Sequence, residues 1–156
     1  MKKILYIVLG IIIFFIIILI FSLFYFTSLD TSQESVVKYI HANTVKYISA
    51  ELEKCRLGET SIVSGNLNCD SVNPNSLALA VSKNSDDVNP YDLSVKAVII
   101  KKNWDALDSP KSRLGYVILH SGSDKESLYI TTFLKEFDDA DPEKDLLTTS
   151  IKIGIK

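Results

Sequence analysis

The sequence has few of the residues that most often build enzyme active sites and metal centres. Its 156 residues include only two histidines, two cysteines, one tryptophan and one methionine. It contains no G-x-S-x-G, H-E-x-x-H, C-x-x-C or phosphate-binding glycine motif. A catalytic base or a metal ion needs several partners held within reach. We therefore expect a protein that is not an enzyme, with no catalytic residue, no metal site and no cofactor.

Two features could still suggest chemistry, and both have a simpler interpretation. His41 falls in a helical pattern and His120 ends a strand-like run, so both are interpreted as surface or boundary residues. The acidic stretch 138–145, DDADPEKD, offers oxygen atoms of the kind that bind calcium. Its spacing departs from a calcium-binding loop, and Lys144 stands where such a loop has glycine. We interpret it as a charged turn.

Charge is absent from one long stretch near the N-terminus. Residues Ile4 to Phe26 are almost entirely aliphatic or aromatic. As a helix they would measure about 34 Å, whereas a bilayer core is roughly 30 Å thick. A cleaved signal peptide is the alternative, but its apolar core is usually shorter and a small-residue cleavage site follows it. The pattern predicts a membrane-spanning helix that begins at Ile4 and ends at Phe26.

The charges around this stretch predict its orientation. Lys2 and Lys3 precede it, whereas Asp30 and Glu34 follow it. The positive-inside rule then places the N-terminus in the cytoplasm and residues 27–156 in the periplasm or outside the cell, with inner-membrane lipid as one partner. Without the two N-terminal lysines, 15 basic side chains face 19 acidic ones, a net charge of −4. That balance does not favour a nucleic-acid partner.

The two cysteines, Cys55 and Cys69, lie 14 positions apart. On the exported side of a membrane such a pair is expected to form a disulfide. Two free buried thiols are the alternative. Closing a loop of this size can stabilise a small domain by about 3 kcal/mol.

A helical pattern precedes the cysteines. Apolar side chains recur at spacings of three and four, which marks one face of a helix: Val37, Ile40, Thr44 or Val45, Ile48, Leu52 and Cys55. Gly58 favours an end at about Leu57. Residues 31–34 fit a capping box, which would start a new helix. Because no proline or glycine lies between Ile11 and Leu57, we favour one long helix, bent or loosened near residues 27–32.

The C-terminal third alternates with the period of β-strands. Strands are expected over 114–120, 127–137 and 147–155, joined as an antiparallel meander. Between the cysteines and these strands, a short helix over 77–83 and a turn at 89–92 are expected. Residues 93–100 fit either a strand or a helix, and their β-branched side chains favour an extended segment.

The expected fold is α+β. A long N-terminal helix, with a membrane-spanning half and an amphipathic half, packs on a three- or four-stranded antiparallel sheet. The domains are residues 1–26, a cytoplasmic stub and transmembrane helix, and residues 27–156, an exported domain. The exported domain comprises the amphipathic helix 27–57, the disulfide loop and connecting region 58–112, and the meander 113–156.

The stretch HANTVKYISAELEKCRLGETSIVSGNLNC, followed by NPYD and then by LGYVILH, LYITT and TTSIKI, resembles a group of short bacterial type IV pilins. The resemblance covers roughly residues 35–155. It implies a pilin-like fold with a helix-end and loop cysteine pair. Pilins of this family also carry a leader that ends in glycine and, shortly after it, a glutamate. Here Ile11 follows Gly10, and no acidic residue precedes Asp30.

The resemblance also implies a function. The chain would be a structural subunit of a type IV pilus or pseudopilus-like fibre, or a minor component of one, that polymerises through its apolar N-terminal helix. Its partners would be further copies of itself or other pilin-like subunits. The alternative is a membrane-anchored exported binding domain with a pilin-like fold that does not polymerise.

Overall fold

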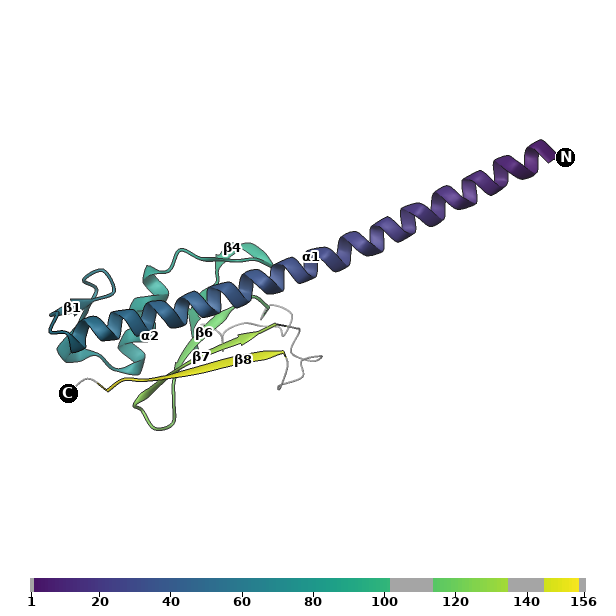
Figure 1. Ribbon diagram of the computed structural model, residues 1–156. Helices are drawn as coiled ribbons and strands as arrows, with labels where there is room; N and C mark the ends of the chain where they lie inside the picture. Colours follow the sequence, from purple (N-terminus) through teal and green to yellow (C-terminus); the bar gives the residue numbers. More distant parts are fainter. Residues whose placement is uncertain (1, 102–113, 135–144, 155–156) are drawn as a thin grey trace. The chain divides into compact units, whose positions relative to one another are not determined.

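A computed structural model describes the backbone of residues 2–101, 114–134 and 145–154, and within the first helix it describes the side chains of residues 10–22 and from residue 32 onward. The described part is α+β, with three helices and eight strands (Figure 1). The elements in chain order are α1 (Lys2–Arg56), β1 (Ser61–Ile62), β2 (Leu67–Asn68), η1 (Cys69–Ser71), α2 (Pro74–Asn84), β3 (Val88–Asn89), β4 (Asp92–Lys96), β5 (Val98–Ile100), β6 (Val117–Ser121), β7 (Ser127–Phe133) and β8 (Leu146–Lys152). The chain divides into two compact units, Met1–Gln33 and Glu34–Lys156.

The first unit consists of the N-terminal part of α1. Its side chains from Ile11 to Phe21 are all large, apolar and between 45% and 75% exposed. No helix in the described part of the chain is long and apolar enough to cross a membrane.

That finding contradicts the predicted fold and the predicted localisation. The membrane-spanning half of the first helix and the single-pass membrane localisation are both wrong. The predicted ends of the span, Ile4 and Phe26, have side chains outside the described ones. The predicted description of the chain as a membrane-anchored pilin-like protein falls with them. The helix itself is present, since α1 runs without a break from Lys2 to Arg56, through the capping-box residues 31–34 where a new helix could have begun.

The second unit begins with the remainder of α1, which ends at Arg56. Gly58, two residues later, has a φ of +93° and its amide donates to the carbonyl of Cys55. A positive φ suits glycine because it has no Cβ, so the chain can leave the helix sharply here. The helix therefore stops one residue before the predicted Leu57.

The main sheet is mixed rather than antiparallel, which corrects the predicted fold. Its strand order is β5-β6-β7-β8, with β5 parallel to β6 and the other pairs antiparallel. A parallel pair needs a long crossover connection. The chain provides one, since 16 residues separate Ile100 at the end of β5 from Val117 at the start of β6. Two further two-stranded sheets, β1-β2 and β3-β4, lie outside this sheet.

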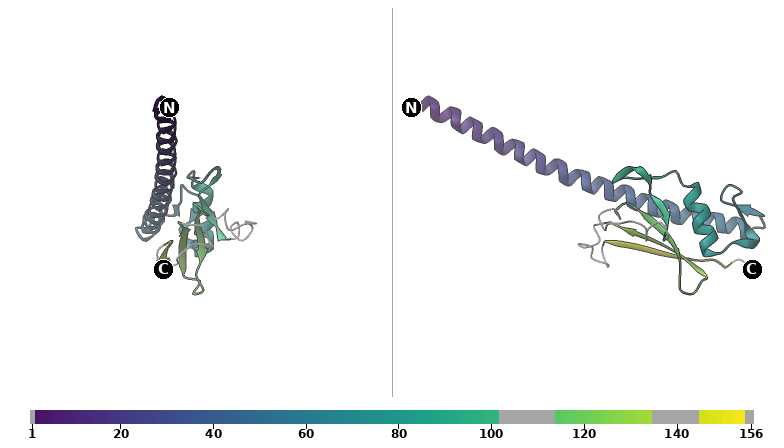
Figure 2. Two further views of the ribbon diagram at one scale, coloured as in Figure 1. Left: turned by 90° about the vertical axis from the view of Figure 1, so that its right-hand side faces the viewer. Right: turned by 180° about the vertical axis from the view of Figure 1, so that it is seen from behind.

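Besides a smaller buried cluster around Ile118, one large core holds the second unit together. It joins α1, α2, the β1-β2 hairpin and the main sheet, and its fully buried large side chains include Ile48, Leu52, Ile62, Leu77, Leu119, Leu128 and Ile130. Both views in Figure 2 show α2 and the strands of the main sheet alongside the second half of α1. At about 1.5–3 kcal/mol per fully buried large apolar side chain, this cluster is the main favourable term in the stability of the unit.

The helix α2 is well defined by its own sequence. Asn73 caps its N-terminus, where its side chain accepts from the amides of Asn75 and Ser76, and Pro74 occupies the first helical position. The helix is longer at its start than the predicted range 77–83 because the cap lies at Asn73.

Candidate functional site

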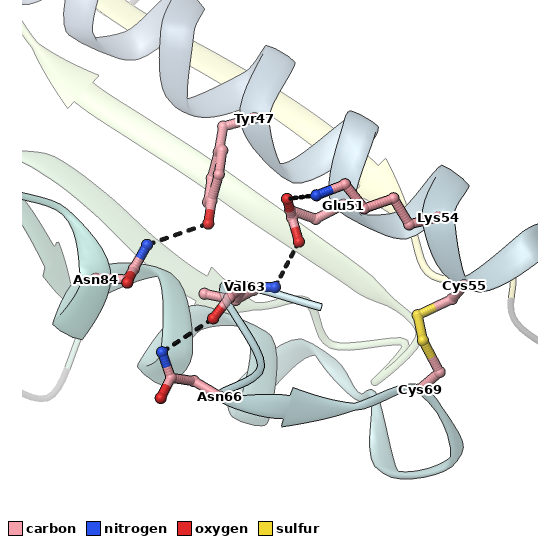
Figure 3. A network of polar contacts seen from close by, with 8 residues as sticks. All are labelled: Tyr47, Glu51, Lys54, Cys55, Val63, Asn66, Cys69 and Asn84. Atoms are coloured by element: carbon pink, nitrogen blue, oxygen red, sulfur yellow. Dashed lines mark hydrogen bonds and ion pairs between the residues drawn. A yellow bond between two sulfur atoms is a disulfide. The ribbon is translucent and has the colours of Figure 1, made fainter. Parts of the chain in front are cut away.

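A group of polar contacts lies at the C-terminal end of α1, against the β1-β2 hairpin (Figure 3). Cys55, in the last turn of α1, forms a disulfide with Cys69, the first residue of η1. Their Cα atoms are 5.5 Å apart, and both side chains are buried. The bond ties the end of the helix to the end of the loop that follows it.

Glu51 lies one turn before Cys55 and provides a second tie. Its side chain is only 5% exposed, although a carboxylate is costly to bury. The carboxylate accepts a hydrogen bond from the amide of Val63, and it also binds the Lys54 ammonium at 2.5 Å (Figure 3). The hydrogen bond to Glu51 raises the pKa of Lys54 above its ordinary value. Glu51 therefore holds the tip of the hairpin against the helix.

The hairpin tip has an unusual backbone. Val63 and Ser64 have φ values of +53° and +55°, and Gly65 follows with +83°. A positive φ is rare for a β-branched residue such as valine and costs free energy. The Val63 side chain is fully buried in the core, and Asn66 donates to its carbonyl through both the backbone and the side-chain amide. Core packing, Asn66 and Glu51 together stabilise this conformation.

A small hollow lies between α1 and the end of α2. It encloses about 260 Å³ and is lined by polar side chains that include Asn43, Tyr47, Asn84, Asp86 and Asp87. The Asn84 amide donates to the Tyr47 hydroxyl at 3.2 Å, which joins the two helices (Figure 3). No group of three or more metal-ligating side chains occurs in the part of the chain that the structure describes.

The structure corrects the interpretation of His41. This side chain is only 7% exposed, and its two ring nitrogens each lie 3.0 Å from a threonine hydroxyl, those of Thr132 on β7 and Thr149 on β8. Burial lowers the pKa of His41 below 6.5. The prediction of a surface or boundary position failed because the hydrogen-bond partners lie 91 and 108 positions away in sequence.

The other candidate residues are less connected. His120 is half-buried on β6, where its ring stacks on that of Tyr129 at a centroid distance of 5.5 Å. Most of the acidic stretch 138–145 lies outside the described residues, and the one residue within them, Asp145, is buried. The sequence-based predictions did not single out Glu51, although its spacing of three from Ile48 and four from Cys55 places it beside the apolar face, whereas Glu53 lies on the exposed side.

Glu51 binds Lys54 and Val63, Asn66 binds Val63, and Asn84 binds Tyr47, so these contacts hold a loop and two helices in place. No protein-family model, curated protein or solved structure matches this chain.

Proposed function

We propose that this chain is a structural subunit of a type IV pilus or pseudopilus-like fibre, and that subunits assemble through residues 11–21 of α1. The resemblance of residues 35–155 to short type IV pilins motivates the proposal. The observation that supports it best is the exposure of eleven consecutive large apolar side chains on one helix.

These residues form an apolar surface on every side of the helix. The least exposed of them, Ile18, is 45% exposed, and the most exposed, Phe21, is 75% exposed. A helix that is apolar all round is normally buried. Burying one such side chain fully is worth about 1.5–3 kcal/mol, so eleven together can exceed the roughly 4–15 kcal/mol that association costs.

Other copies of the same segment are suitable partners. The segment carries no charged or polar side chain, so bringing copies together buries no unsatisfied group. Isoleucine, leucine and phenylalanine pack closely in helix interfaces. Because several neighbours are needed to surround one helix, self-association of this segment would form a helical bundle, and the resemblance to pilins favours such a bundle at the centre of a fibre.

The second unit can stay folded while the first is buried in such an assembly. Its core is built from residues 40 onward, including the disulfide that ties the end of α1 to the hairpin, and among the side chains that the structure describes it contains none of the first unit. Each subunit would thus contribute one apolar helical segment and one independently folded domain.

The test compares two double variants of the full chain. F14E/F21E places charges in the apolar segment, whereas L57E/L93E places them at equally exposed apolar positions of the second unit, where Leu57 is 78% and Leu93 74% exposed. Sedimentation and electron microscopy at rising concentration measure assembly. We expect the parent and L57E/L93E to form fibres or large oligomers and F14E/F21E to remain monomeric or dimeric.

Two results would contradict the proposal. A parent chain that stays monomeric at all concentrations would favour the alternative function, a binding domain that does not polymerise. Assembly of F14E/F21E to the same extent as the parent would show that residues 11–21 do not mediate association.

A further inference from the structure

The two edges of the main sheet differ in how they are covered. At one edge, β5 packs against α2, and the carbonyl of Val98 accepts a hydrogen bond from the Ser82 hydroxyl at 3.0 Å. At the other edge is β8, which pairs only with β7 within the described residues (Figure 1, yellow). Its side chains at Thr148, Ser150 and Lys152 are exposed. Within the described residues, the outer edge of β8 therefore has no strand partner.

The direction of the backbone hydrogen bonds shows which groups of β8 face outward. The Ile153 amide donates to Glu126, and the Leu134 amide donates to Asp145. In an antiparallel pair, alternate residues point their N–H and C=O groups to the same side. The odd-numbered residues of β8 therefore bond to β7. The even-numbered ones, which direct their backbone groups away from β7, are Leu146, Thr148, Ser150 and Lys152.

The edge has few of the features that usually prevent strand pairing. Natural edge strands are protected by charge, proline, a bulge or short length. β8 has seven residues, no proline and an unbroken register with β7. Its one charge, Lys152, lies at its end and binds Glu126 at 3.6 Å.

We propose that β8 pairs in antiparallel orientation with β8 of a second copy of this chain, so that Thr148 of each copy lies opposite Ser150 of the other. The pairing joins the two four-stranded sheets into one sheet of eight strands. It goes beyond the proposed fibre contact, because it involves only the second unit.

The extent of overlap between the two strands selects this register. When Thr149 lies on the two-fold axis, each of the four outward-facing residues of one β8 lies opposite an outward-facing residue of the other. This pairing allows about eight backbone hydrogen bonds, which is within the usual range for a protein interface. Lys152 then lies opposite Leu146, and no two like charges meet. If Ser150 lay on the two-fold axis instead, one outward-facing residue of each strand would have no residue of the other β8 opposite it. Because the same edge is used twice, the contact closes as a two-fold dimer.

The test follows individual backbone amides in the full chain. The protein is incubated in deuterated buffer over a range of concentrations, exchange is quenched, and residual protons are read by NMR after dissolution. Paired edge amides at Thr148 and Ser150 should exchange about tenfold or more slowly at high concentration than at low concentration. The Thr149 amide, which faces β7, serves as an internal control and should be protected throughout.

Two charge variants test the register. T148K/S150K places a lysine opposite a lysine at both positions and should abolish the concentration-dependent protection, since like charges opposite each other are destabilising. T148K/S150E places a lysine opposite a glutamate and should retain it. Equal protection in both variants would overturn the proposed register.

The experiment on β8 pairing and the experiment on fibre assembly can fail independently of each other. F14E/F21E should keep the protection at Thr148 and Ser150, because its changes lie in the first unit. Fast exchange of both amides at every concentration in the parent chain, with Thr149 protected, would overturn the β8 pairing and leave assembly through residues 11–21 unaffected.

Discussion

The Nδ1 atom of His41 on α1 lies 3.0 Å from the Oγ1 atom of Thr132 on β7. Thr132 is fully buried, and the other ring nitrogen of His41 reaches Thr149 on β8 at the same distance. One imidazole therefore connects a helix to two neighbouring strands. Such a buried polar link is favourable only while all of its members keep their hydrogen bonds.

We predict that His41 makes the second unit less stable in mild acid. Burial lowers the pKa of His41 in the folded state, so below about pH 6.5 the unfolded chain binds a proton that the folded chain does not. The free energy of unfolding should be largest above pH 6.5 and fall as the pH drops from 6.5 toward the folded-state pKa. Urea unfolding at a series of pH values measures it.

H41Q is the matched control for this pH dependence. Glutamine keeps a donor and an acceptor but does not titrate. Between pH 5 and 7 its unfolding free energy should be nearly flat. If H41Q and the parent show the same dependence, His41 is not its source.

We predict that removing the Glu51 carboxylate loosens the β1-β2 hairpin. E51A leaves the buried Val63 amide without its acceptor, which typically costs about 1–3 kcal/mol. E51Q keeps an oxygen acceptor and should cost less. E53A is the control, because Glu53 is exposed and its ion pair with Arg56, at 3.3 Å, is worth about 0–1 kcal/mol. Chemical denaturation ranks the three, and an E53A effect as large as that of E51A would contradict the role of Glu51.

We predict that the Cys55–Cys69 disulfide stabilises the second unit substantially. C55S/C69S should lower the unfolding free energy by about 2–4 kcal/mol. A reducing agent should lower the denaturation midpoint of the parent chain and leave that of the variant unchanged. A parent midpoint that does not respond to reduction, with the thiols shown to be free, would contradict the prediction.

We predict that Gly115 cannot be replaced without loss of stability. Its φ is +78°, and a Cβ there would lie 2.8 Å from Cγ of Asn89 and from Cδ2 of Tyr91. Asn89 is buried, and its amide donates to the Leu114 carbonyl at 2.7 Å. G115A should cost about 1–2 kcal/mol from the backbone, and more if Asn89 is displaced. G154A, where a Cβ would meet nothing within 4 Å, should be nearly neutral in the same thermal melt.

Local patterns predicted a large part of the secondary structure. The apolar spacing from Val37 to Cys55 indicated the helix that becomes the second half of α1, and period-two alternation indicated strands that overlap β6, β7 and β8. These features depend on residues a few positions apart. The prediction of a membrane span was wrong for a related reason, because it was inferred from the hydropathy of one run of residues. No helix in the described part of the chain has the length and hydropathy that a span needs.

Pairings between distant residues were beyond the reach of these patterns. The parallel pairing of β5 with β6 joins strands that are separated by 16 residues, and no local signal distinguishes it from an antiparallel one. The position of Glu51 under the hairpin depends on the unusual backbone of Val63, which sequence periodicity does not encode.

The sequence by itself determined where α1 ends, which of its later residues form an apolar face, and that the segment from Ile11 to Phe21 has no polar side to present to water. These follow from side-chain chemistry and from the periods of helix and strand. Only the tertiary structure decided that His41 is buried between two threonines, that the sheet is mixed, and that β8 is at one edge of the described sheet. Those properties arise from which distant segments pack together, because burial and hydrogen-bond partnership belong to pairs of segments and not to either one alone.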